Sequence, residues 1–263
     1  MLIAAAVCPH PPLLVPEMAG AAAAELDGLR AASFEAVRRL GLTLVVAGEP
    51  RRSEPPLDLV VVVGGDETTR EYDPSKAYAT LRPYGLDWFY SPGWGEEQPL
   101  PLSLSIGQWL LFKGTLGDAR GMLATPERLQ AVAEDATAEE CLALGRELAG
   151  SAERVGLLVM GDGSACRSEK APGYLDPRAE GFDATVAQAL GNADAATLAA
   201  LDPVVARELQ AAGRAAWQVL AGAAGASTGV GCQNLFQADL LADQAPYGVG
   251  YFTASWLRSF QAG

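Results

Sequence analysis

The sequence predicts one α/β domain, residues 1–263, built on a mostly parallel central sheet with helices on both faces. Three short apolar runs predict buried strands: Leu2–Val7, Leu59–Val63 and Val155–Met160. Each run is followed by Pro or Gly together with polar residues, and helix-start signals lie between the runs. Because strands that alternate with helices form parallel sheets covered on both sides, we expect the three strands to be neighbours. Neither a linker nor an internal repeat divides the chain.

Helix-start signals support this alternation. Thr125, Asp176 and Asp202 each place a capping side chain directly before a proline. The segment Thr137–Glu140 has the sequence of a capping box, in which the first and last side chains satisfy each other's backbone N–H groups. A helix is therefore expected after each of these four positions.

Periodicity adds two more elements. After Pro203, apolar residues at helical spacing predict one buried helix face: Val205, Leu209, Trp217 and Leu220. Near the N-terminus, Glu25–Val46 is mostly helical in pattern, although its end, Leu42–Val46, also fits a strand, and periodicity does not decide between them. Val249–Thr253 predicts a weaker strand close to the C-terminus.

The middle of the chain, Glu67–Gly121, breaks the rhythm of strands and helices. It is rich in Pro, Gly and aromatic residues, and long irregular segments in compact domains are usually functional loops. Pro101–Ile106 is a candidate extra strand. We expect this segment to border the site, with at least one tryptophan at its mouth, or else to form a dimer contact. The tryptophans considered are Trp88, Trp94 and Trp109.

Composition restricts the partners. A net charge of −13 and a pI near 4.5 argue against binding to nucleic acid, whose phosphates need clustered Lys and Arg. No run of about 20 apolar residues is long enough to span a membrane, and no signal peptide is evident. The four cysteines are far apart, which favours free thiols and a cytoplasmic protein over a disulfide framework: Cys8, Cys141, Cys166 and Cys232.

Polar residues follow the carboxyl ends of the three predicted strands, where α/β sheets bind ligands. His10, the only histidine, follows the first strand; Asp66 and Glu67 follow the second; Asp162 and Ser164 follow the third. Cys8 and His10 are two residues apart in extended chain, so their side chains are expected on one side, where they could begin a soft-metal site. A hydrogen-bonded structural histidine is the alternative.

The turn after the third strand carries no standard catalytic motif. Gly161–Cys166 could direct backbone N–H groups at an anion, but it is followed by no GK[ST] and contains no GxSxG. The chain also lacks GxGxxG, which disfavours the usual dinucleotide fold.

Four stretches together resemble the class III extradiol ring-cleavage dioxygenases, and within them the subunit-B-like (LigB-like) branch of single actinobacterial chains. They are CPHPPLLVPE, VVVVGGDETT, LLVMGDGSACRSEKAPGYLDPRAEGFDATV and YGVGYFTASW, and they cover most of the chain in the family's order. The resemblance implies a LigB-like fold and Fe(II)- and O₂-dependent opening of catechol rings, with iron held by two histidines and one carboxylate.

The resemblance also assigns positions. His10 matches the first iron-binding histidine, and Glu67, or less well Asp66, stands where the second is expected. The base histidine falls on Ala165, and the third ligand falls near Ala212. The remaining residues implied to line the pocket are Cys8, Asp162, Ser164 and Arg167.

One histidine cannot supply two iron ligands and a base. Two functions follow from this departure. The first is an enzyme with a changed site, in which His10 holds Fe(II) or another divalent metal together with Glu67 or Asp66, and Cys8 is a further candidate ligand. Ser164 and Arg167 would line the pocket, and the substrate would be a small aromatic or other planar, oxygen-rich compound. The second is a non-catalytic small-molecule-binding or adaptor protein on the same fold, with no metal. A homo-oligomer is compatible with either function.

Overall fold

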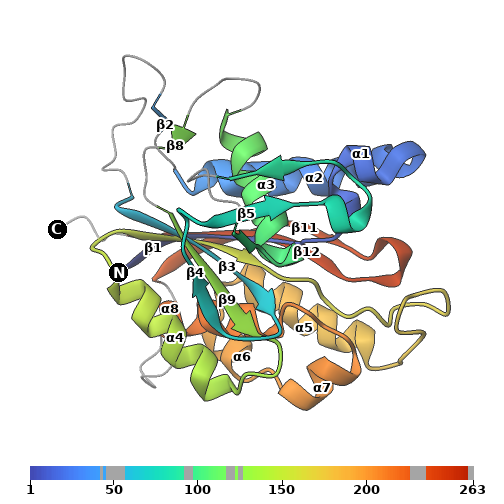
Figure 1. The fold of residues 1–263 in the computed structure, drawn as a ribbon. Coiled ribbons are helices and arrows are strands. Elements are labelled where there is room, and N and C mark those ends of the chain that lie inside the picture. Colours follow the sequence, from blue (N-terminus) through green and yellow to red (C-terminus); the bar gives the residue numbers. More distant parts are fainter. Residues whose placement is uncertain are drawn as a thin grey trace.

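The computed structural model describes residues 1–41, 44–45, 57–91, 97–116, 122–123, 127–225 and 235–259. Its centre is a seven-stranded mixed sheet in the order β11-β12-β1-β10-β3-β9-β4 (Figure 1). The strands of this sheet are β1 Leu2–Cys8, β3 Leu59–Asp66, β4 Arg70–Tyr72, β9 Glu127–Ala133, β10 Val155–Met160, β11 Phe236–Gln244 and β12 Tyr251–Arg258. The α/β class predicted from the sequence is confirmed.

The three strands expected to be neighbours are neighbours. β10 lies between β1 and β3 and is parallel to both, and β9 extends the parallel part of the sheet beyond β3. Every residue of β1 and β10 is buried, because helices cover both faces of the sheet. The outer strands β12, β11 and β4 are antiparallel to their neighbours.

β3 continues through Gly64 and Gly65 to Asp66, past the glycines that were expected to end it. Gly64 has a packing role, because a Cβ atom there would lie 2.5 Å from the Ser103 hydroxyl oxygen at the start of α3. Because the strand continues through Gly64 and Gly65, Asp66 lies at the end of the sheet formed by the carboxyl ends of the parallel strands.

Helices cover the two faces in separate layers (Figure 1). One face carries α2 Asp27–Arg39 and α3 Leu102–Leu116, with α1 Pro16–Ala19 beside them. The other face carries α4 Ala138–Gly150, α5 Ala179–Gly191, α6 Ala195–Ala199, α7 Pro203–Glu208 and α8 Arg214–Ala223. The 3₁₀ turns are η1 Pro12–Leu14, η2 Gly20–Leu26, η3 Arg82–Tyr84 and η4 Pro246–Gly248. Within the described ranges, no helix combines the length and the apolar character needed to cross a bilayer.

Two of the predicted caps are present. Thr137 and Glu140 form the complete capping box of α4. The Asp202 carboxylate accepts from the N–H groups of Val204 and Val205 at the start of α7. At Asp176 the prediction is wrong in detail: α5 begins at Ala179, and the Asp176 carboxylate instead binds the side chain of Arg178.

Two predicted elements have the wrong type. Glu127–Ala133 is strand β9 rather than a helix, because it pairs with β3 on one side and β4 on the other; Thr125 itself lies outside the described residues. Leu102–Ile106 form the start of α3 rather than a strand.

The helical segment near the N-terminus is shorter than its pattern suggested, since α2 ends at Arg39. Of the two alternatives for Leu42–Val46, the structure has the strand: Leu44–Val45 forms β2, which pairs with β8 Met122–Leu123.

The single helix expected after Pro203 is broken into α7 and α8. Gln210, between them, has a φ of 53°, a left-handed conformation that ends a helix. Leu209, Trp217 and Leu220 are nevertheless fully buried, as the periodicity predicted.

The middle segment is more regular than its composition suggested. Besides β4 and α3 it forms a small sheet of β5 Ala77–Thr80, β6 Phe89–Tyr90 and β7 Gln98–Pro99. Trp109 is buried in the core against Phe34, and Trp88 packs against the same core. Neither tryptophan lines the cleft described below. Trp94 lies outside the described residues.

Candidate functional site

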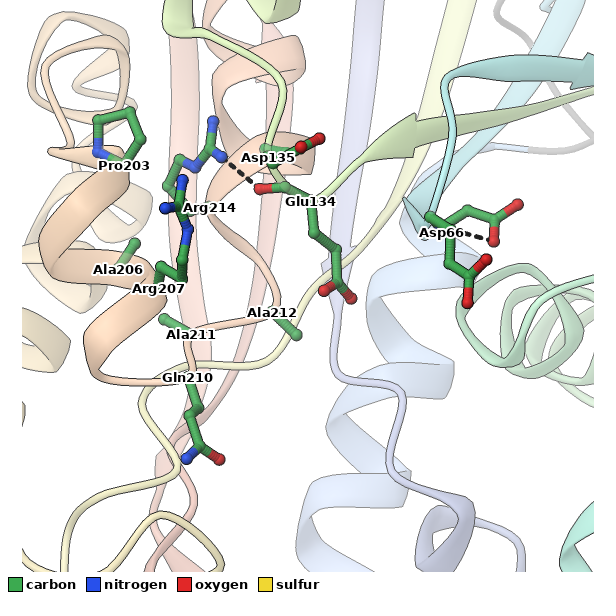
Figure 2. Close-up of a pocket in the computed structure, with 12 residues that line it drawn as sticks. Asp66, Glu134, Asp135, Pro203, Ala206, Arg207, Gln210, Ala211, Ala212 and Arg214 are labelled. Carbon is green, nitrogen blue, oxygen red and sulfur yellow. Dashed lines mark hydrogen bonds between the residues drawn. The ribbon is translucent and has the colours of Figure 1, made fainter.

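A cleft of about 610 Å³ lies at the carboxyl ends of β3 and β9, facing α7 and α8 (Figure 2). Parallel strands place their carboxyl ends at one edge of the sheet, which is where this fold class binds ligands. The lining residues are Asp66, Glu67, Glu134, Asp135, Pro203, Ala206, Arg207, Gln210, Ala211, Ala212, Arg214 and Ala215. The volume falls within the range of small-molecule sites.

Small residues keep the cleft open. Gly65 lies next to two residues of the cleft, since a Cβ atom there would contact the Ala212 carbonyl oxygen at 3.5 Å and Glu134 Oε1 at 3.7 Å. Ala206, Ala211 and Ala212 supply the side facing the sheet. The position that the family resemblance assigned to a metal ligand, Ala212, therefore lies in the cleft but offers no ligating side chain.

Asp66 lies in the cleft wall but its carboxylate is already engaged. It accepts from the Tyr72 hydroxyl at 2.9 Å, from Arg70 Nη2 at 3.2 Å and from the Glu67 backbone N–H at 2.8 Å. Burial, assisted by Asp66, raises the pKa of Tyr72 to about 12, so the tyrosine remains a hydrogen-bond donor. Glu67, the predicted metal ligand, is exposed beside Asp66 at the rim of the cleft.

Arg214 forms the opposite, buried wall and is only 2% exposed. Its guanidinium donates to the Ala136 carbonyl at 2.5 Å, to Gln218 Oε1 at 3.1 Å and to the Glu134 carbonyl. Burial lowers the pKa of Arg214. These bonds fix the turn after β9, and so they hold the Glu134 side chain in the cleft (Figure 2).

His10 lies where β1 and β10 end, and its neighbour is Asp162. The backbone N–H of His10 donates to Asp162 Oδ1 at 2.8 Å, and Nδ1 of the imidazole lies 3.5 Å from the same oxygen. Nδ1 is buried and makes no hydrogen bond. Burial raises the pKa of Asp162, and His10 opposes that rise.

Ser164 lies near His10. The backbone N–H of His10 binds Asp162, and Ser164 is two residues further along the chain, a step of at most about 7 Å. Its hydroxyl, however, accepts from the Cys166 backbone N–H at 3.0 Å and is fully buried. Ser164 therefore stabilises the turn after β10 and does not line the cleft. Ala165, the position of the family's base, is also buried.

The half-buried Arg167 and the buried Asp183 form an ion pair beside this turn. Arg167 Nη1 donates to Asp183 Oδ2 at 3.0 Å, and the Ser164 N–H donates to Asp183 Oδ1 at 2.8 Å. Asp183 is 1% exposed, and burial raises its pKa. Arg167 is thereby placed against Asp183 rather than in the cleft.

Cys8 is fully buried and is not among the residues that line the cleft. Its thiol points into the core on the side of α2, 3.8 Å from the Ser33 carbonyl oxygen, and burial raises its pKa to about 12. β1 ends at Cys8 and Pro9 follows, so the side-chain alternation assumed for Cys8 and His10 does not continue to a shared site. Cys8, Cys141 and Cys166 are free thiols, all buried.

The described residues contain no group of three or more His, Cys, Asp or Glu side chains that could hold a metal ion. His10 has the carboxylate of Asp162 beside it, whereas the positions expected to complete an iron site are Ala165 and Ala212. The residues that the structure describes therefore do not fit the two-histidine, one-carboxylate iron site that the family resemblance implies.

Sequence reasoning missed much of the cleft: Glu134, Asp135, Arg207, Gln210 and Arg214. Glu134 and Asp135 directly follow β9, and reading that segment as a helix hid their place at a strand's carboxyl end. Arg214 begins α8 after a break that periodicity did not reveal.

No family model matches the chain, and no curated protein matches it. Among solved structures, the chain is similar to the uncharacterized protein JW3007 from Escherichia coli K12. The TM-score is 0.52 with 16% sequence identity, and the match covers 97% of this chain and 99% of that one. At this identity the similarity concerns the fold over the whole chain.

Proposed function

We propose that this chain is a LigB-like protein that binds a small polar molecule in the cleft and does not open catechol rings at an ordinary enzymatic rate. The observation that carries the proposal is the cleft itself. It lies where this fold class binds ligands, and it is lined by charged groups and alanines, without histidine. We also place the protein in the cytoplasm, since its cysteines read as free thiols.

The chemistry of ring opening supports the second part of the proposal. That reaction needs imidazoles both to bind iron and to move a proton near neutral pH. The whole chain has one imidazole, and Ala165 supplies neither proton nor ligand. The expected ligand also changes: no aromatic side chain lines the described cleft, so a polar compound fits it better than the small aromatic expected from the resemblance.

Anaerobic loading with Fe(II), followed by a ring-fission assay over a panel of catechols including protocatechuate, tests the absence of ring opening. We expect no turnover, and we expect iron retention to be the same in wild type and His10→Ala. Turnover of about 1 per second or faster that is abolished by His10→Ala would overturn the proposal.

A cleft-filling variant tests the binding site. Ala212→Leu places a larger side chain in the cleft, whereas Ala143→Leu makes the same change at an exposed position of α4. Thermal unfolding of the three proteins is followed with pools of amino acids, amines and organic acids. At least one pool should stabilise wild type and Ala143→Leu but not Ala212→Leu. Equal shifts in all three proteins would place binding elsewhere.

A further inference from the structure

We infer that the cleft binds a small zwitterion of the amino-acid class, with its anionic group at Arg207 and Arg214 and its cationic group at Glu134 and Glu67. This inference rests on the proposed function and names the ligand of the same site. Figure 2 shows the two arginines on the α7–α8 side of the cleft and Asp66 on the β3 side, with Glu134 between them.

The first observation is a buried cation that forms no ion pair. Arg214 is 2% exposed, yet the partners of its guanidinium are carbonyl oxygens, an amide oxygen and the Cys141 sulfur. Asp135 attracts it electrostatically, but among the described residues no carboxylate forms an ion pair with it. Buried charges in proteins are normally paired, because removing an ion from water is costly. Arg214 lines the cleft, so a ligand anion in the cleft would supply the missing charge.

Arg207 adds a second positive charge on the same side. It lies on α7, is exposed, and also lines the cleft. Two other arginines are bound to carboxylates: Arg70 to Asp66, and Arg178 to Asp176 and Glu208. Arg207, in contrast, forms no ion pair with any carboxylate of the described ranges. It is therefore available to a ligand carboxylate, which an arginine can bind through two parallel hydrogen bonds.

The opposite side of the cleft is acidic. The Glu134 side chain extends into the space over Gly65, and Arg214 fixes its backbone carbonyl. Glu67 also lines the cleft and is exposed. Asp66 is already bound to Tyr72 and Arg70, and Asp135 interacts electrostatically with Arg214. Of the four lining carboxylates, Glu134 and Glu67 are therefore left to accept from a ligand ammonium group. A ligand with one charge of either sign would meet repulsion from one of the two walls.

Size and polarity restrict the ligand further. A nucleotide would bring several negative charges toward four acidic residues, and an aromatic ring would find no aromatic partner in the described lining. A free amino acid has one charge of each sign and fits a cleft of about 610 Å³.

The test uses the full-length protein and isothermal titration with the twenty standard L-amino acids, first in pools and then singly. For each amino acid that binds, the matched amine without the carboxylate and the matched acid without the amine are titrated. The variants are Arg207→Gln and Glu134→Gln. Arg146→Gln, on the exposed face of α4, and Glu17→Gln, on α1, are the matched controls.

We expect at least one amino acid to bind, with each matched analogue at least tenfold weaker. Each cleft variant should lower its affinity about tenfold or more, whereas the controls should leave it unchanged. If the matched acid without the amine bound as tightly as the amino acid, the inference of a zwitterionic ligand would be wrong, whereas the proposed binding site would still be supported. The inference is also wrong if no amino acid binds, or if neither cleft variant weakens the binding. In that case, an amine or organic acid that stabilises the wild type but not Ala212→Leu in the thermal assay would still support the proposed binding site.

Discussion

Glu127 is the first residue of β9 and has a half-buried carboxylate. The cleft lies at the other end of this strand. The partner of the carboxylate is the Gln108 amide nitrogen at 3.0 Å, and Gln108 Oε1 is buried without a hydrogen bond. Burial raises the pKa of Glu127, and the bond from Gln108 only partly opposes this. Glu127 also contributes, after burial, to the raised pKa of Tyr90. The ionised carboxylate therefore costs stability here.

Replacing this carboxylate with its neutral amide should stabilise the protein. In Glu127→Gln the charge is gone and a donor becomes available to Gln108 Oε1, so we expect the free energy of unfolding at pH 7 to rise by about 1 kcal/mol. Urea denaturation followed by circular dichroism measures it. Glu17→Gln, at an exposed position, should change nothing. A loss of stability in Glu127→Gln would mean that the charge is compensated.

At the scale of elements, α4 and α8 pack through two glycines. A Cβ atom at Gly145 would lie 2.0 Å from the Val219 carbonyl oxygen, and one at Gly222 would lie 2.2 Å from the Leu142 carbonyl oxygen. The backbones of the two helices therefore touch at their crossing. This contact fixes the second half of α8 against α4.

Gly145→Ala should separate these helices. Because the obstacle is backbone rather than a flexible side chain, we expect a loss of about 2–3 kcal/mol in the free energy of unfolding. Gly150→Ala is the matched control: it lies at the end of the same helix, with nothing within 4 Å of a Cβ atom. Helix propensity should leave it neutral or slightly more stable. Equal effects of the two substitutions would contradict the close crossing.

The elements that sequence could predict are those whose signal is local. Leu2–Val7 and Val155–Met160 are continuous apolar runs, and the capping box at Thr137 is complete within four residues. β9 is different: Glu127–Ala133 has no strong strand pattern of its own and is a strand because β3 and β4 lie on either side of it. Pairing between distant segments decided its structure, and local sequence does not record that pairing.

At the scale of the molecule, the candidate site depends on the meeting of three distant segments. Asp66 follows β3, Glu134 follows β9 and Arg207 lies on α7. The rule for parallel sheets predicted the first contribution, since it places ligands at strand ends. The arginines come from the helical layer, whose position against the sheet is fixed by packing. The same packing placed Cys8 in the core and left His10 beside Asp162.

The stability of the whole protein should be highest in mild acid. Burial raises the pKa values of Glu127 and Asp183, so the folded state binds these protons more tightly than the unfolded state does. Their contribution is complete below the unfolded pKa values, near 4, and is lost as pH rises through the folded values. Lowering the pH from 7 toward 5 should therefore raise the free energy of unfolding, and partial neutralisation of the net charge of −13 should act in the same direction.

Below about pH 4 the sign reverses. Hydrogen bonds from Arg38 and Arg39 lower the pKa of Glu35 to about 2, and bonds from Arg178 lower that of Asp176 to about 2, so their contributions are lost as the pH falls toward 2. Both carboxylates are near the surface, where solvent weakens such pairs, so this decline should be shallow at first. Urea titrations at intervals from pH 3 to pH 8 measure the profile, and Glu127→Gln should flatten its rise between pH 7 and 5. A free energy of unfolding that decreases steadily from pH 7 to 5 would show that the buried carboxylates are balanced by charges that this reasoning omits.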